Sequence, residues 1–310
     1  MNFSDIKALV EPDLIASKKI IAASCYSNVP LIIDISSHLL NSNSKQIRPL
    51  ITILCSYLCD YRGEQHINIA AALELIHTAT LLHDDVIDNS KLRRGQTTAN
   101  YRWGNDTAVL IGDFFLAKSS QIITALNNIE ILKTVNATIC DIVEGELLQL
   151  ANKNNLAITQ KTYLQIISAK TAKLFELAAA LPATLADCSQ DVKKNIAAYG
   201  MHLGIAFQLT DDLLDPQDLT EGNLTLPIIY LLTHGSKQEK NFIKEVIHTQ
   251  AKEVMPELQT IIASSGAIAY TIKHAKQEAT LAKEALSTFA NSIYKDAAYC
   301  LIDFIISRDY

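Results

Sequence analysis

Apolar residues recur every three or four positions through most of this chain, and that spacing restricts it to helices. Segments such as ALELIHTATLLHDDVID and YGMHLGIAFQLTDDLLD place their apolar residues on one helix face, and strict alternation over the length of a strand is hard to find. Only 10 glycines and 7 prolines occur among 310 residues, and hydrophobic residues make up 49%, which disfavours a turn-rich β fold. An all-α fold is therefore predicted.

The breaks between the helical segments are short. None is long enough to be a domain linker, so roughly ten or more helices with short connections predict one large bundle. We therefore expect residues 1–310 to form a single domain around one core. Turn-forming residues gather at 41–49, 60–65, 91–105, 151–159, 185–191 and 215–227.

Net charge and cysteine usage indicate which class of ligand the protein binds and in which cellular compartment it lies. A net charge of −6 gives no basic surface for nucleic acid, so a small diffusible ligand is expected. The six cysteines are scattered without a C-x-x-C pair, which predicts buried free thiols in a reducing compartment.

Charged residues interrupt the N-terminal segment, and no run approaches the roughly 18 to 20 apolar residues of a membrane span. A cytoplasmic protein without a transmembrane segment is predicted, with any membrane contact peripheral.

The motif D-D-x-x-D occurs twice, each time among apolar helical residues. Residues four apart share a helix face, so each copy points two carboxylates the same way, and each of these like charges needs a cation or a proton. Hard oxygen ligands suit Mg²⁺, which also takes phosphate oxygens from a substrate. A single copy would as readily cap a helix or lie on a solvated surface, but two copies favour Mg²⁺ with a diphosphate. The copies are Asp84, Asp85 and Asp88, and Asp211, Asp212 and Asp215.

Basic and polar side chains near these motifs match the remaining charge of a diphosphate. Arginine and lysine donors complement phosphate oxygens, and a histidine seven residues before the first motif shares its helix face. Each alone would be an ordinary solvated or core-edge residue. The candidates are Lys45, Arg48, His77, Arg93, Arg94, Lys170, Thr171 and Gln208.

Together these segments resemble the trans-isoprenyl diphosphate synthases, and the long-chain octaprenyl type most of all. The resemblance covers nearly the whole chain and is carried by KQIRP, ELIHTATLLHDDVIDNSKLRRGQTTAN, EGELLQL, AKTAKLFELAA and GIAFQLTDDLLD. It implies a large all-α bundle with a deep apolar cavity, usually a homodimer. It also implies elongation of an allylic prenyl diphosphate with isopentenyl diphosphate, with peripheral membrane contact for release of the product.

The resemblance also assigns roles to individual residues. It implies that Asp84 and Asp88 hold two Mg²⁺ and Asp211 a third, while Asp85, Asp212 and Asp215 support them. It implies that isopentenyl diphosphate is bound by Lys45, Arg48, His77 and Arg94. The residues implied to contact the allylic diphosphate are Arg93, Lys170, Thr171 and Gln208.

Product length in this family depends on residues just before the first motif, where a bulky aromatic residue at the fifth preceding position blocks the growing chain. Here that position is Ala79, followed by Thr80. Small side chains imply an open tunnel and a long product, close to forty carbons. Ala79 would equally serve close helix packing.

Two departures from the family pattern leave an alternative open. The usual Gly-Gly before the first lysine is Asn43 and Ser44, and a loop that normally carries Gly-Lys after Asp215 is absent, with Asn223 in place of a further lysine. Each lost charge-assisted phosphate contact is worth about 1.5 to 3 kcal/mol. The alternatives are therefore a catalytically impaired or regulatory subunit, and an enzyme that cyclises or couples prenyl chains.

Overall fold

Helices form almost all of the regular structure. A computed structural model describes residues 1–40, 45–93, 95–214, 222–249 and 254–307. Within these ranges the strands are limited to one two-residue antiparallel pair, β1 (Leu92–Arg93) and β2 (Gln96–Thr97). The all-α prediction is confirmed.

The chain divides into two compact units. The N-terminal unit comprises Ser4–Val135 and Ala178–Lys193, and the C-terminal unit comprises Met1–Phe3, Asn136–Leu177 and Lys194–Tyr310. Four of the described helices contain residues of both units: α1 (Phe3–Leu9), α8 (Ile129–Ala151), α10 (Lys173–Leu185) and α11 (Gln190–Leu214).

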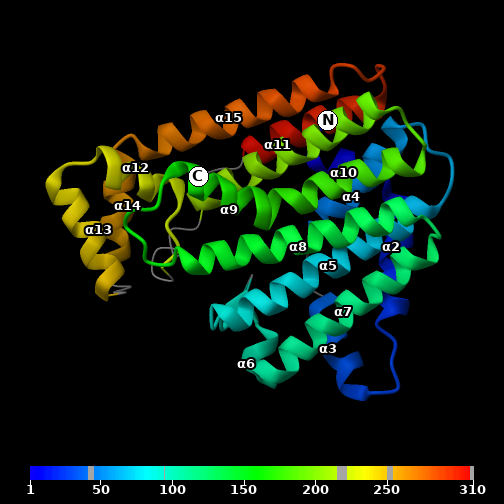
Figure 1. Cartoon of the computed structure of the whole chain (residues 1–310), viewed down its shortest axis with the longest axis horizontal. Coiled ribbons are helices and arrows are strands. Elements are labelled where there is room, and N and C mark those ends of the chain that lie inside the picture. The colour runs from blue at the N-terminus through cyan, green and yellow to red at the C-terminus, as the bar shows by residue number, and fades with distance from the viewer. Residues whose placement is uncertain (41–44, 94, 215–221, 250–253, 308–310) are drawn as a thin grey trace. The chain divides into compact units, whose positions relative to one another are not determined.

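The centre of the N-terminal unit is α5, which packs against α7, α4 and α2 (Figure 1). Small residues allow α5 and α7 to approach closely, since Ala79 and Ala108 are both fully buried in one core cluster with Phe115. A fully buried side chain the size of phenylalanine stabilises the fold by about 1.5 to 3 kcal/mol. The helices of this unit are α1 (Phe3–Leu9), α2 (Glu11–Ser24), α3 (Pro30–Leu40), α4 (Ile47–Leu58), α5 (Gln65–Ile87), α6 (Ala99–Trp103) and α7 (Asn105–Ala125).

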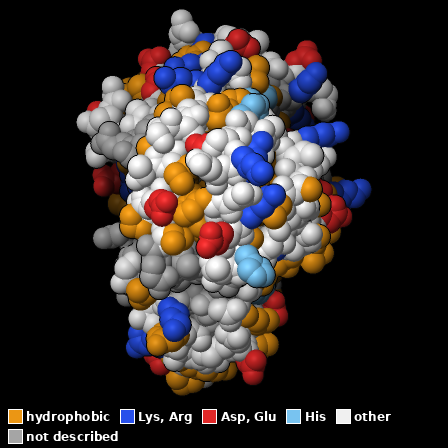
Figure 2. All heavy atoms as spheres, turned by 90° about the vertical axis from the view of Figure 1, so that its left-hand side faces the viewer, with side chains coloured by type: hydrophobic (Ala, Val, Ile, Leu, Met, Phe, Trp, Pro, Cys, Tyr) orange, Lys and Arg blue, Asp and Glu red, His pale blue; other side chains and the backbone are white. Residues whose placement is uncertain are grey.

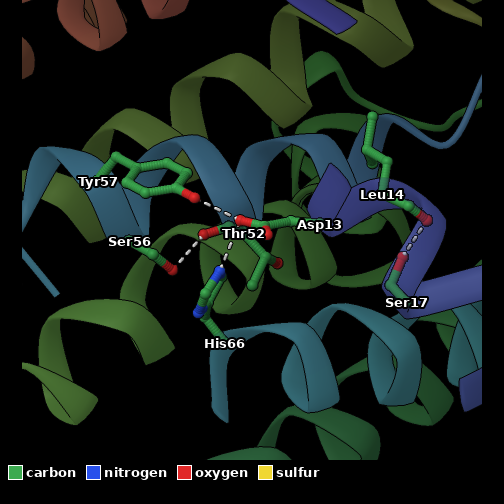
Figure 3. A network of polar contacts seen from close by, with 7 residues as sticks. All are labelled: Asp13, Leu14, Ser17, Thr52, Ser56, Tyr57 and His66. Carbon is green, nitrogen blue, oxygen red and sulfur yellow. Dashed lines mark hydrogen bonds and ion pairs between the residues drawn. The ribbon is translucent and has the colours of Figure 1, made fainter. Parts of the chain in front are cut away.

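A partly buried polar network joins α2, α4 and α5 (Figure 3). Asp13 Oδ2 accepts a hydrogen bond from the Tyr57 hydroxyl at 2.5 Å and lies 3.0 Å from Nε2 of His66. Along α4, Ser56 donates its hydroxyl to the carbonyl of Thr52 at 2.8 Å. Because buried polar groups must be paired, this network fixes how the three helices meet.

The C-terminal unit is built around α12 and α15. These two helices pack together, and α15 also packs against α16 (Figure 1). Its core cluster includes Tyr163 and Leu209, which come from α9 and α11. The remaining elements are α9 (Gln160–Ile167), a wide π-helical turn η1 (Ser168–Ala172), α12 (Leu226–His234), α13 (Lys237–Thr249), α14 (Met255–Ser264), α15 (Ala267–Leu286) and α16 (Ile293–Ile306).

Among the described helices, α7 is long and apolar enough to cross a membrane by length and composition, with a mean hydropathy of 1.3. The sequence alone had predicted no run long enough for a membrane span. In the structure α7 packs on α5, with Ile111 and Phe115 in the core cluster, and 33% of its apolar window is buried. One such helix is weak evidence for a membrane span.

Charged groups of both signs lie at the surface. On the face drawn in Figure 2, basic and acidic side chains are interspersed with apolar ones.

All six cysteines are free thiols, as predicted, but their predicted burial is wrong for Cys140, which is exposed. Burial raises the pKa of the Cys55 thiol well above its usual range, which makes that thiol unreactive.

Candidate active site

The first aspartate motif lies at the carboxyl end of α5. Asp88 caps the helix, and Asn89 ends it by adopting a left-handed conformation with φ of 52°. The backbone N–H of Ser90 then donates to the carbonyl of Asp85 at 2.9 Å, and that of Asn89 donates to Val86. This pairing is a Schellman motif, which fixes the last turn of the helix.

The three aspartates of this motif differ in burial. Asp84 and Asp88 are partly exposed on one side of the helix, whereas Asp85 is only 5% exposed. Asn100 donates its side-chain amide to the Asp85 carbonyl at 2.9 Å, which ties α6 to this turn. The four-residue spacing therefore presents Asp84 and Asp88 together, as the sequence predicted, and turns Asp85 inward.

Arg93 is bound to Asp85. Its Nε and Nη2 atoms donate to Asp85 Oδ1 at 2.9 and 2.8 Å. Burial raises the pKa of the Asp85 carboxyl, and the Arg93 guanidinium opposes that rise. Arg93 lies in β1 opposite Gln96, and the hairpin closes through Gly95 at φ of 77°. Arg94 lies outside the described residues, and the contact of Arg93 with the allylic diphosphate stays a prediction.

The electrostatics of the α5 terminus favour a cation. The carboxyl end of a helix carries about half a negative charge from its unpaired carbonyls. Asp84 and Asp88 add two carboxylates at the same end, and Asp85 adds a third behind them. Arg93 offsets the charge of Asp85, and a divalent ion would stabilise the carboxylates of Asp84 and Asp88, whose oxygens are donors that Mg²⁺ prefers.

The predicted ligands of isopentenyl diphosphate that the structure describes lie at the start of α4 and on α5. Lys45 is exposed just before α4, and Arg48 is partly exposed in the first turn of that helix. His77 is partly exposed on α5, two turns before Asp84. The left-handed conformation of Gln46, with φ of 52°, sets the entry of the chain into α4 between the two basic residues.

The second aspartate motif lies in the last turn of α11, where Asp212 is 6% exposed. Gln208, one turn earlier, donates its side-chain amide to Asp212 Oδ1 at 2.7 Å. The Tyr163 hydroxyl from α9 donates to the other oxygen, Oδ2. Thr171 donates its hydroxyl to the Gln208 carbonyl oxygen at 2.7 Å. Asp215 lies outside the described residues, and Asp211 is partly exposed.

Lys170 lies in the wide turn η1 and is held by α8. Its Nζ atom donates to Glu146 Oε2 at 2.8 Å and to Gln149 Oε1 at 2.9 Å. Single wide turns of this kind occur often at functional sites, because the extra residue changes the direction of the side chains. The lysine ammonium is thereby fixed in position before any substrate binds.

Two glycines let neighbouring helices press against η1. A Cβ atom at Gly145 of α8 would lie 2.7 Å from Ala169 Cβ, and one at Gly204 of α11 would lie 2.6 Å from Ala172 Cα. Separations this short do not occur between real carbon atoms, whose contacts are optimal near 3.5 to 4.0 Å. Glycine at these two positions is therefore what permits the close approach.

The two predicted chain-length residues differ in environment. Ala79 has no exposed surface and packs in the core cluster shared by α5 and α7. Thr80 is partly exposed and donates its hydroxyl to the His77 carbonyl at 2.8 Å. The effect of both residues on product length stays a prediction.

Sequence reasoning missed three residues that the structure brings to the second motif and to Lys170. Tyr163 carried no signal, because a tyrosine seven residues before a lysine belongs to no recognisable pattern. Glu146 and Gln149 lie in the segment EGELLQL, which was quoted for the resemblance but given no role. Their three-residue spacing on a helix was the available signal.

The donor set fits a metal ion that is shared with a substrate. Among the described residues, no group of three or more His, Cys, Asp or Glu side chains is placed to hold a metal ion. Pairs such as Asp84 and Asp88 therefore supply only part of a coordination shell. This matches Mg²⁺, which commonly combines one or two carboxylates with water and phosphate oxygens.

Known proteins resemble this chain along most of its length. Residues 29–264 match the family model described as polyprenyl synthetase. The chain is 35% identical over 322 residues to an octaprenyl diphosphate synthase of Escherichia coli, with all of both chains covered. It is 36% identical to an all-trans-nonaprenyl-diphosphate synthase (geranyl-diphosphate specific) of Rhodobacter capsulatus, over 98% of this chain and 97% of the relative.

Two solved structures of prenyl-chain synthases are also similar to this chain. A polyprenyl synthase from Caulobacter crescentus complexed with calcium and isoprenyl diphosphate has a TM-score of 0.96 and 34% identity, covering 99% of this chain and 98% of that one. A decaprenyl diphosphate synthase from Rhodobacter capsulatus has a TM-score of 0.94 and 32% identity, covering 99% of both. An all-α fold with two aspartate motifs at helix ends thus defines the class. The chain belongs to the polyprenyl synthetase family.

Proposed function

We propose that this protein is a long-chain trans-polyprenyl diphosphate synthase that condenses isopentenyl diphosphate with an allylic prenyl diphosphate. Prenyltransferase activity of the trans type is what its family membership and full-length relatives support. The observation that carries the proposal is the pair of aspartate motifs, each at the end of an apolar helix and each with hydrogen-bonded basic or amide side chains beside it. The proposed product is close to forty carbons long.

The proposed metal ligands are Asp84 and Asp88 for two Mg²⁺ and Asp211 for a third. When bound, these ions would neutralise negative charge that develops on the diphosphate as the allylic carbon–oxygen bond breaks. Asp85, Asp212 and Asp215 are proposed to orient the ligands.

The substrate contacts are proposed in two sets. Lys170 and Arg93 would donate to oxygens of the allylic diphosphate, each from a position already fixed by a carboxylate partner. Isopentenyl diphosphate would be bound by Lys45, Arg48, His77 and Arg94. Thr171 and Gln208 hydrogen-bond each other, and their proposed contact with the allylic diphosphate would require Thr171 to redirect its hydroxyl proton.

The reaction requires that water be kept from the allylic cation, since water would trap it. Apolar side chains around the motifs serve that purpose, and the double bond of isopentenyl diphosphate attacks the cation instead. Loss of a proton restores the alkene, and the released diphosphate is the proposed acceptor. No dedicated protein base is proposed.

The finer features of assembly and location are also proposals. We propose a cytoplasmic homodimer in which residues 1–310 form one catalytic domain and peripheral membrane contact serves product release. Support for the homodimer comes from an apolar row on α8, where Val143, Leu147 and Leu150 are 52, 59 and 40% exposed. Exposed apolar rows of this kind favour self-association. Sedimentation of the purified protein would test it.

An elongation assay tests the proposed function. Purified protein is incubated with Mg²⁺, radiolabelled isopentenyl diphosphate and farnesyl diphosphate, and products are resolved by chain length. Asp84→Ala should abolish elongation, whereas Asp113→Asn, which changes a carboxylate on α7 outside both motifs, should leave it intact. A folded wild-type sample that makes no elongated product at any Mg²⁺ concentration would contradict the proposal and support the alternative of an impaired or regulatory subunit.

A further inference from the structure

Asp212 is held from two sides by the C-terminal unit. Gln208 donates to one carboxylate oxygen, and the Tyr163 hydroxyl donates to the other. Gln208 is itself oriented by the Thr171 hydroxyl at 2.7 Å. The result is a hydrogen-bonded chain that runs from η1 through α11 to α9.

Tyr163 is fixed independently of Asp212. It is 4% exposed and belongs to the core cluster of the C-terminal unit. Its helix begins at Thr159, whose hydroxyl accepts the backbone N–H of Thr162 at 3.1 Å. One turn before Tyr163, Gln160 accepts the Tyr270 hydroxyl at 2.6 Å, which anchors α9 to α15. The phenol therefore reaches Asp212 from a rigid support.

We propose that Tyr163 is a positioning residue for the second metal-binding motif. Its hydroxyl fixes the Asp212 carboxylate, and through it the last turn of α11 that presents the neighbouring Asp211. This inference rests on the proposed function, in which Asp211 binds Mg²⁺.

The physical reason is the rotational freedom of the Asp212 carboxylate. With a donor on each of its two oxygens, the Asp212 carboxylate is held in one orientation. With the phenol removed, Asp212 loses the donor on Oδ2 and gains freedom to rotate. A carboxylate that changes orientation beside a metal ligand alters the coordination shell, and loss of such supporting hydrogen bonds commonly costs 10- to 100-fold in metal affinity or activity.

Tyr163→Phe tests the inference, because it removes one hydroxyl and keeps the ring in the core. We expect the half-saturating Mg²⁺ concentration to rise, and turnover to fall, by about 10- to 100-fold. The KM for isopentenyl diphosphate should change by less than about twofold, since its proposed ligands lie elsewhere. Calorimetry with inorganic pyrophosphate and Mg²⁺ gives a readout independent of activity, and the Kd should rise by a similar factor.

Tyr299→Phe is the matched control, because its hydroxyl donates to the Lys283 carbonyl at 3.3 Å within the same unit. It should change neither Mg²⁺ dependence nor pyrophosphate affinity. A structural role alone for Tyr163 would lower the melting temperature without this selective effect on Mg²⁺. If Tyr163→Phe does not fold, Asp212→Asn weakens the same hydrogen bond from the acceptor side and should weaken Mg²⁺ binding in the same direction, and unchanged Mg²⁺ binding would overturn the inference.

A double-mutant cycle with Asp212→Asn decides whether Tyr163 acts through Asp212. The double variant should be no worse than Asp212→Asn alone, because the hydroxyl then has no carboxylate to fix. Fully multiplicative losses, or a Tyr163→Phe enzyme with wild-type Mg²⁺ dependence, would overturn the inference. An inactive wild-type enzyme would instead refute the proposed function, so the two failures are distinguishable.

Discussion

Gly204→Ala should reduce the elongation rate more than it reduces the stability of the fold. The added methyl group would lie 2.6 Å from Ala172 Cα, 2.9 Å from Ala172 Cβ and 3.0 Å from Phe175 Cβ. The nearest atom belongs to the backbone, so no rotamer change relieves the contact. To restore an ordinary carbon–carbon separation, α11 must move from η1 by about 1 Å.

The expected magnitudes follow from this displacement. Overpacking costs about 1 to 3 kcal/mol, and replacement of a helical glycine by alanine returns about 1 kcal/mol, so the net loss of stability is about 0 to 2 kcal/mol. The same shift would stretch the 2.7 Å hydrogen bond between Thr171 and Gln208 to about 3.7 Å, which breaks it. Misplacement by 1 Å can cost about 100-fold in rate.

The assay compares urea denaturation with elongation kinetics for Gly204→Ala and a control. Gly112→Ala is that control, because its methyl group would meet only the ring of His83, the far end of a side chain that can turn away. Gly112→Ala should be neutral or slightly stabilising and fully active. A Gly204→Ala enzyme with wild-type stability and turnover would refute the reasoning that close packing on η1 sets the site geometry.

Three further changes probe the tunnel and the stability of the fold. Ala79→Tyr should shorten the products in the elongation assay, with about 1 to 3 kcal/mol of overpacking because Ala79 is fully buried. Lys295→Met should cost roughly 1.5 to 3 kcal/mol in urea denaturation, since the buried Nζ atom donates to the carbonyls of Phe289 and Ser287. Burial lowers the pKa of His274 below its usual 6.5, with Lys273 lowering it further and Glu278 opposing. The neutral ring is thus favoured in the folded state, so its stabilisation is present above pH 6.5 and lost as pH falls through the lowered pKa. His274→Gln should therefore lose less stability than wild type between about pH 7 and 5.

Each of these has a result that would count against it. Unchanged products from a folded Ala79→Tyr enzyme would show that this position does not limit chain length. Equal stability of Lys295→Met and wild type would mean that water replaces the ammonium at both carbonyls. Parallel melting curves across the pH range for wild type and His274→Gln would exclude His274 as the group responsible.

The sequence was sufficient for the helices and for the exposed side of the first motif. Helical periodicity is a local property, and the four-residue spacing alone directed Asp84 and Asp88 to one side of α5. The turn residues after the first motif predicted that Arg93 returns over the end of the helix, but its pairing with Asp85 in particular was not predicted. Tyr163 reaches Asp212 across 49 positions of sequence. Such long-range contacts leave no periodic trace in a single chain.

The wide turn η1 carries one residue more than an α-helical turn would need between α9 and α10. An α-helix advances by about 100° per residue, so deletion of that residue would rotate every side chain beyond it by about this angle. Phe175 would leave the core, and Lys170 would lose its partners on α8, although no side chain had been altered. The segment should therefore reject a change in its length even where every side chain that contacts a neighbour is kept.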